Sequence, residues 1–158
     1  MKLIGHLSFV LIATLLAGTI SADPQPFSLT IERPTRKLQP GSPVEIKLTL
    51  TNTSGREITF IDTNRWCDYG IEIRDSHGQL PPETRYKREL KCGFRVMAGR
   101  RMIRALQPRE SFQDEMPVSQ LYDLSRPDDY YIQVARKVPK KLGDGTVKSN
   151  AVTITVIE

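Results

Sequence analysis

The chain has 158 residues, with 23 Lys and Arg against 18 Asp and Glu and a formal net charge of +5 at pH 7. This length fits one ordinary domain, and 39% hydrophobic with 26% charged residues is typical of a folded chain. Two cysteines and two histidines exclude a cysteine-rich scaffold and disfavour a multi-ligand zinc site. We therefore expect no metal ion and no cofactor.

Residues 1–22 have the pattern of a secretory signal peptide. Lys2 supplies the positive start, residues 7–18 form an apolar run, and Ala22 ends the segment expected before cleavage. The apolar run is too short to cross about 30 Å of hydrocarbon as a helix. No cysteine follows it, so the bacterial lipoprotein signal is missing. The sequence predicts a secreted or periplasmic protein of residues 23–158, without a transmembrane segment after cleavage.

Cys67 and Cys92 both lie in the predicted mature part, 25 positions apart. In an oxidising compartment, an isolated cysteine pair most often forms a disulfide. A redox or metal-binding pair is the alternative. However, the sequence has no Cys-x-x-Cys, and His77 is the only histidine after the signal peptide. We therefore predict a structural disulfide between Cys67 and Cys92.

Apolar and polar residues alternate with a period of two along most of the mature chain, which is typical of strands with one buried face. In the first half, the alternation predicts strands at 27–31, 44–50, 58–60 and 71–73. Turns are predicted between them at 40–41, 52–55 and 75–78. The turn at 52–55 is predicted because Asn and Gly tolerate a positive φ.

The second half is less regular but continues the pattern. It predicts strands at 102–106, 112–118, 130–134 and 152–156, a short helical turn at 121–124 and a hairpin turn at 143–145. Outside the signal peptide, no window of 12 or more residues keeps a helical period. Seven or eight short strands separated by turns predict an all-β fold, an antiparallel β-sandwich. A small barrel is the alternative architecture, and the pattern does not separate the two.

Three stretches resemble a known family. Residues 44–60, VEIKLTLTNTSGREITF, look like the paired B and C strands of bacterial immunoglobulin-like domains, and residues 69–78 are similar to the strand and Asp-x-x-Gly turn that follow. Residues 106–112 and 127–134 resemble the Leu-x-Pro-Gly and Pro-Gly-x-Tyr-x-(Ile/Val)-x-Val signatures, with Arg109 and Asp128 in the glycine positions. This order also resembles the BsuPI-type proteinase-inhibitor domain. The resemblance implies an immunoglobulin-like β-sandwich of seven or eight strands over residues 23–158.

Three aromatic residues have both a structural and a functional interpretation. Tyr130 stands near the start of a predicted strand, where a tyrosine can bury its ring and return its hydroxyl to the backbone as a tyrosine corner. Tyr131 should point to the opposite face and is the better candidate for a binding surface. Trp66 precedes Cys67, and we favour packing of its indole on the disulfide over stacking on a ligand.

The charges are concentrated in two neighbouring segments of opposite sign. Residues 85–109 hold nine Lys and Arg against one acid, and residues 110–129 hold six acids against Arg126. In one interpretation the two segments fold together and neutralise each other. In the other, the basic segment is exposed and binds anions, because the planar guanidinium of Arg suits carboxylate and phosphate. The residues predicted to bind in that case are Arg95, Arg100, Arg101 and Arg104, with Tyr131 as an aromatic contact.

Motifs for catalysis are missing from the sequence. His77 lies in a predicted exposed turn, and there is no Gly-x-Ser-x-Gly, His-Glu-x-x-His, phosphate-binding glycine loop or dinucleotide fingerprint. We therefore predict a secreted, non-enzymatic binding module for a protein or an anionic polymer of the cell envelope. The alternative is a proteinase inhibitor that uses the disulfide-tied loop 81–104, and a small hydrolase is least favoured. Nucleic acid is disfavoured as a partner, and the oligomeric state stays open.

Overall fold

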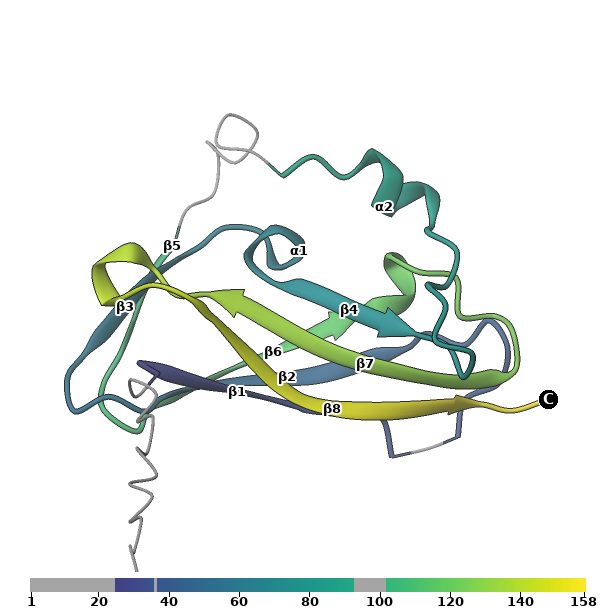
Figure 1. Ribbon diagram of the computed structural model, residues 1–158, viewed down its shortest axis with the longest axis horizontal. Coiled ribbons are helices and arrows are strands. Elements are labelled where there is room, and N and C mark those ends of the chain that lie inside the picture. The colour runs from purple at the N-terminus through teal and green to yellow at the C-terminus, as the bar shows by residue number, and fades with distance from the viewer. Residues whose placement is uncertain (1–24, 36, 93–101) are drawn as a thin grey trace, which may run out of the picture.

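The computed structural model describes residues 25–35, 37–92 and 102–158 (Figure 1). The predicted signal peptide therefore lies outside the described residues. The same holds for Arg95, Arg100 and Arg101, three of the four arginines predicted to bind anions.

Eight strands and four short helical segments make up the described part of the chain. The strands are β1 Phe27–Glu32, β2 Glu45–Asn52, β3 Ile58–Asp62, β4 Gly70–Arg74, β5 Met102–Leu106, β6 Ser111–Pro117, β7 Asp128–Lys137 and β8 Thr146–Val156. The helices are α1 Arg65–Asp68 and α2 Arg85–Glu89, with 3₁₀ turns at Val118–Gln120 and Lys140–Leu142.

The strands form three antiparallel sheets, in the orders β1-β2-β6, β4-β7-β8 and β3-β5. Figure 1 shows β1, β2 and β6 as one layer behind β4, β7 and β8, with the β3-β5 ribbon at one end. The fold is all-β and sandwich-like with eight strands, which confirms the predicted fold class.

The period-two alternation places the core where the sequence predicts it. On β2, Ile46, Leu48 and Leu50 are fully buried, while Glu45 and Lys47 between them face solvent. On β7, Ile132 and Val134 fill the core from the opposite sheet. Each strand thus contributes one apolar face to a shared interior, as a two-layer sandwich requires.

One side of the sandwich is closed between β1 and β8. The side chain of Asn150 on β8 accepts from the backbone N–H of Ile31 at 2.8 Å and donates to the Ile31 carbonyl at 3.0 Å. Further along, Leu38 forms an isolated parallel bridge with Val156 at the end of β8. The Asn150 side chain thus satisfies both backbone groups of Ile31 on this edge of β1, and the edge lies against β8.

Tyr130 forms the predicted tyrosine corner. Its ring is buried, and its hydroxyl donates to the backbone carbonyl of Arg126 at 3.0 Å, four residues upstream. Its neighbour Tyr131 points to the outer face, as the alternation predicts. The structural interpretation of Tyr130 is therefore confirmed.

The helical turn predicted at 121–124 is wrong in its position. A 3₁₀ turn lies at Val118–Gln120 instead, directly after Pro117 ends β6. Leu121 and Leu124 are buried in the core, and Tyr122 forms a bridge with Glu83. The apolar spacing of this segment therefore reflects insertion into the core and not a helix.

Arg109 is strained in a way that a single substitution should relieve. It lies in the turn between β5 and β6 and has a φ of +68°, a left-handed conformation that costs a non-glycine residue about 1–2 kcal/mol. Glycine relieves this strain but also adds conformational entropy to the unfolded chain, which offsets part of the gain. We therefore expect R109G to raise the free energy of unfolding by about 0.5–1 kcal/mol. Urea denaturation measures this change.

The matched control is R56G, at an exposed position of the β2-β3 turn where the φ is not positive. Glycine there adds unfolded-state entropy without relieving strain, so stability should fall. If both variants lose stability equally, Arg109 is not strained.

Candidate functional site

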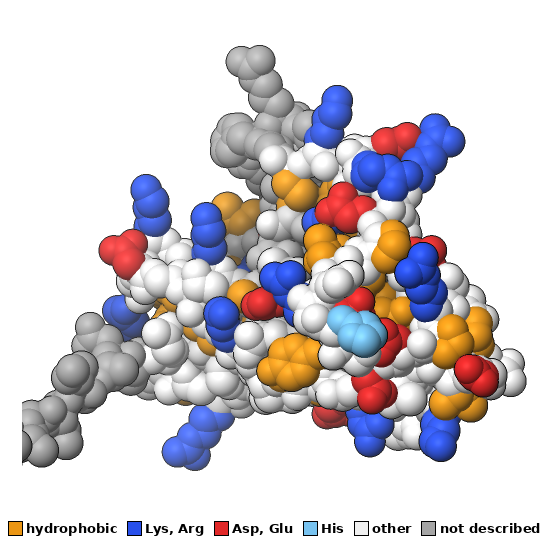
Figure 2. Space-filling view, turned by 45° about the vertical axis from the view of Figure 1, so that its right-hand side comes forward, with side chains coloured by type: hydrophobic (Ala, Val, Ile, Leu, Met, Phe, Trp, Pro, Cys, Tyr) orange, Lys and Arg blue, Asp and Glu red, His pale blue; other side chains and the backbone are white. Residues whose placement is uncertain are grey.

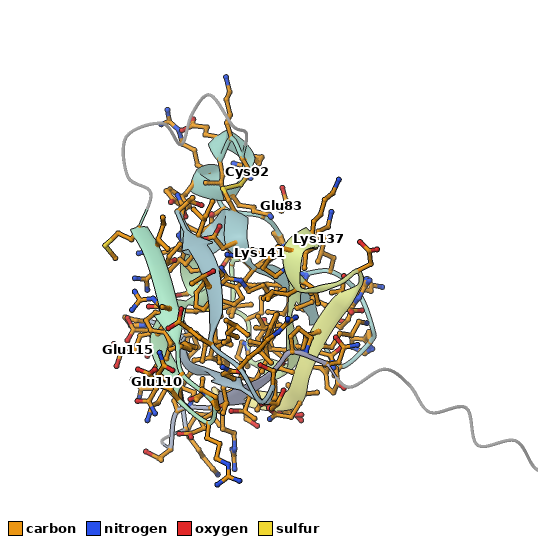
Figure 3. All side chains as sticks on the ribbon, turned by 90° about the vertical axis from the view of Figure 1, so that its left-hand side faces the viewer. Glu83, Cys92, Glu110, Glu115, Lys137 and Lys141 are labelled. Atoms are coloured by element: carbon orange, nitrogen blue, oxygen red, sulfur yellow. A yellow bond between two sulfur atoms is a disulfide. The ribbon has the colours of Figure 1, made fainter. Side chains whose placement is uncertain are left out.

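The sandwich is open on the side opposite the β1-β8 contact. β5 and β6 follow each other along the chain across a short turn, but β5 pairs with β3 and β6 pairs with β2. A groove of about 650 Å³ lies where the two strands diverge, lined by residues of β3, α1, α2, β5 and β6. Figure 3 looks at this end, with β5 at its left-hand edge above the labelled Glu115 and Glu110. We call this region the open groove.

Asn52 organises the end of the β3-β5 ribbon where Ile58 pairs with Leu106. Its side chain is fully buried; Nδ2 donates to the carbonyls of Leu106 at 2.9 Å and Arg56 at 2.8 Å. Oδ1 accepts from the backbone N–H of Ser54 at 2.9 Å and from its hydroxyl at 2.8 Å. One amide thus joins the β2-β3 turn to the end of β5, which fixes where the ribbon leaves the sandwich.

The turn at 52–55 exists, but the reason given for it from the sequence is wrong. Neither Asn52 nor Gly55 has a positive φ. Asn52 is the last residue of β2, and it forms the turn through side-chain hydrogen bonds to the backbone, as asparagine does in Asx turns.

Helix α1 forms one wall of the open groove, and side-chain hydrogen bonds and the disulfide hold this helix in place. Asn64 caps α1 by accepting from the Trp66 N–H at 3.0 Å, while Asp68 accepts from both the N–H and the hydroxyl of Thr63. Cys67 in α1 is bonded to Cys92, which confirms the predicted disulfide. The bond ties the segment after α2 to α1.

Arg104 lies in the open groove, and its charge is already paired. Its guanidinium lies 3.1 Å from the carboxylate of Asp62 and stacks over the ring of Phe112, 3.7 Å from the centroid. Its partner therefore comes from β3 and not from residues 110–129, which the charge pattern would have suggested. Paired and stacked in this way, Arg104 shapes the groove more than it offers a free positive charge.

A second ion pair crosses the groove. Arg65 of α1 lies 3.2 Å from Asp114 of β6 and also donates to the backbone carbonyl of Glu115. Burial raises the pKa of Asp114 above its ordinary value, and the nearby Arg65 guanidinium opposes part of that rise. The groove therefore holds two Arg–Asp pairs beside the ring of Phe112.

The β3-β5 ribbon carries an exposed apolar surface. Ile61 and Ile103 are directly opposite each other in the register, so they share one face, and they are 51% and 79% exposed. Met102, also exposed, lies at the rim of the open groove. We call Ile61 and Ile103 the isoleucine pair. Two adjacent exposed isoleucines on a two-stranded ribbon form a patch of the kind that marks interaction sites.

A buried arginine holds the ribbon in place. Arg136 of β7 is 6% exposed; it donates to the hydroxyl of Tyr69 at 2.7 Å and to the carbonyl of Ile61 at 3.2 Å. Its guanidinium lies 4.5 Å from the ring centroid of Phe60 and 4.6 Å from that of Tyr69. Burial raises the pKa of Tyr69, and Arg136 opposes that rise. The isoleucine pair therefore stands on a strand that is fixed to the sandwich.

Tyr131 lies away from this site. It is on the outer face of the β4-β7-β8 sheet, half exposed, in register with Arg74 on one side and Thr153 on the other. It does not line the groove that contains Arg104. The two described residues of the predicted anion-binding set are thus not brought together.

The residues just before the basic segment dock on the sandwich through their backbone. Thr84 N–H donates to the Leu121 carbonyl at 2.9 Å, and Asp123 N–H donates to the Pro82 carbonyl at 2.8 Å. Beyond these contacts, α2 pairs Arg85 with Glu89, and Arg88 and Lys91 are exposed. Figure 2 shows this concentration of Lys and Arg at the top of the molecule.

The described residues contain no group of three or more His, Cys, Asp or Glu that could hold a metal ion. His77 lies in the exposed turn at 75–78, where its N–H donates to Asp75. No helix among the described residues has the length and apolar character to span a bilayer.

Comparison of the sequence with protein-family models gives no match, and the search of curated proteins gives none either.

Proposed function

We propose that the protein is a non-enzymatic interaction module that binds an extended segment of a partner protein along the free edge of β5. On one side of this edge lies the open groove, and on the other face of the β3-β5 ribbon lies the isoleucine pair. The observation that carries this proposal is the isoleucine pair, two exposed apolar side chains on a ribbon that Arg136 holds in place. Burying both side chains under a partner removes them from water. Full burial of an exposed isoleucine is worth about 1.5–3 kcal/mol, and Ile61, which is 51% exposed, gains less of this than Ile103.

An extended segment fits this side because β5 presents a free edge. Within the described residues, β5 has β3 as its one strand partner, so the other edge of β5 has unpaired backbone groups. A peptide can add to such an edge as a further strand, with main-chain hydrogen bonds supplying affinity and side-chain contacts supplying specificity. The two Arg–Asp pairs beside the edge are placed to select polar side chains of that segment.

A protein partner accounts for these residues better than an anionic polymer does. An anionic polymer would need unpaired cations, whereas Arg104 is paired with Asp62 and stacked on Phe112. The apolar isoleucine pair has no role in binding a hydrated polyanion. The Cys67–Cys92 disulfide is compatible with an oxidising compartment, which supports the secreted or periplasmic location that the sequence predicts.

Selection of extended peptides from a display library tests the proposal. We expect binders enriched in apolar and β-branched residues at alternate positions, and we expect I103D to weaken them at least tenfold, because a buried aspartate there would be desolvated. The matched control is L80D, which introduces the same charge at another exposed apolar residue, after β4, and it should leave affinity unchanged. Binders that lose affinity with L80D but keep it with I103D would refute the proposal.

A further inference from the structure

A second hollow lies on the other side of α1, beneath the disulfide. Its volume is about 560 Å³, within the range of small-molecule sites, and residues of α1, β4, α2 and β7 line it. We call it the disulfide pocket. It shares Trp66 with the open groove but none of that groove's strand residues.

The pocket exists because two small residues face each other on the outer surface of the sheet. Gly70 of β4 is paired in register with Ala135 of β7, and both line the pocket. Large side chains at these positions would fill the space. Instead, the Cys67–Cys92 bond and Leu121 close it from the sides, so its walls are largely apolar.

Two lysines give this apolar hollow a positive charge. Lys87 of α2 and Lys137 of β7 both line it, and neither forms an ion pair with any described residue. The one acidic residue in the lining, Asp68, already accepts two hydrogen bonds from Thr63. In Figure 3, Cys92 lies at the top with Lys137 and Lys141 below it.

From these features we propose that the disulfide pocket binds a small organic anion, an apolar body that carries one carboxylate, sulfonate or phosphate. The apolar body occupies the hollow over Gly70 and Ala135, and the anionic group lies between Lys87 and Lys137. Neither part is sufficient by itself. A bare inorganic anion leaves the apolar walls unfilled, and a neutral molecule leaves Lys137 without a counter-charge and Lys87 with only the ring of Tyr122, whose centroid lies 5.9 Å from its Nζ. The site is separate from the partner-binding surface proposed above.

Two fluorescent probes with a similar aromatic body separate the two requirements. 8-Anilinonaphthalene-1-sulfonate carries the negative charge, and N-phenyl-1-naphthylamine is its neutral counterpart. We expect the anionic probe to bind at least tenfold more tightly, with sulfate at the same concentration unable to displace it. A135L should abolish binding of both probes because the added side chain fills the hollow. K87E/K137E should abolish only the preference for the anionic probe.

The controls separate this pocket from other apolar surfaces. K37E makes the charge change of one of these two substitutions at an exposed lysine that lines none of the described pockets, and it should have no effect. I103D should also leave probe binding unchanged, so loss of the partner surface and loss of the pocket are distinguishable. Unchanged melting temperatures show that the variants fold, and if A135L does not fold, K87E/K137E decides. Equal affinity for both probes, or a response to I103D and not to K87E/K137E, would overturn the proposal.

Discussion

Replacing Asn52 by alanine should lower the free energy of unfolding by about 3 kcal/mol. The substitution removes four hydrogen bonds at a fully buried position. It leaves the buried carbonyl of Leu106 without the amide that bonds it, whereas the Arg56 carbonyl still accepts from the Ser54 hydroxyl, and an unsatisfied buried polar group costs about 1–3 kcal/mol. Denaturant unfolding followed by tryptophan fluorescence measures the change.

Two further variants separate the role of the amide from that of the turn. S54A keeps the Asn52 amide and removes the hydroxyl that lies 2.8 Å from both Oδ1 and the Arg56 carbonyl, so we expect the free energy of unfolding to fall by about 1 kcal/mol. N52D keeps the acceptor but removes both donors and buries a carboxylate, so it should destabilise at least as much as N52A. If N52A lowers the free energy of unfolding by less than 1 kcal/mol, then water or a rearranged turn satisfies the groups that the amide bonds.

Removing the disulfide should have an effect of similar size. The bond closes the chain between Cys67 and Cys92, a separation of 25 residues. A crosslink of that span stabilises by about 3–4 kcal/mol in the chain-entropy model. C67S/C92S should therefore lower the denaturant midpoint, and reduction of the wild type should give the same midpoint as the variant. Cys92 also anchors the segment after α2, so the disulfide pocket should lose its probe as well.

Reduction of the C67S/C92S variant is the internal control, because a reductant should not change its midpoint. Equal midpoints for the oxidised wild type and the variant would contradict a stabilising role. The distinction matters because the same bond supports the predicted export to an oxidising compartment.

The strands and the core were predictable because each depends on a local pattern. Alternation over Ile46, Leu48 and Leu50 gives both the strand and its buried face. Tyr130 was predictable because the tyrosine corner uses a contact only four residues away. The disulfide followed from composition, since the chain has two cysteines and therefore one possible pair.

The open groove was not predictable because it depends on which distant strands pair. The sequence places β5 and β6 next to each other, yet β5 pairs with β3, more than forty positions upstream, and β6 with β2. Arg136 likewise meets Tyr69 across 67 positions, which no local pattern indicates. The charge pattern was misleading for Arg104, since its partner Asp62 lies outside both charged segments.

The isoleucine pair could have been predicted from the alternation of the sequence. Ile58 and Phe60 define the buried face of β3, so Ile61 falls on the opposite face by the same alternation. An apolar residue at a position where the alternation of its strand predicts a solvent-facing side chain is a candidate for contact with a partner. The same reasoning applies to Ile103 of β5, whose neighbour Arg104 shares a face with Phe60.

Amide hydrogen exchange in the presence of a selected peptide tests the central claim most directly. If the partner adds as a strand to the free edge of β5, the amides of β5 should exchange more slowly in the complex, because that edge becomes hydrogen-bonded. Amides of β8, on the covered side, should be unchanged. Protection confined to β4, β7 and β8, with none on β5, would contradict the account.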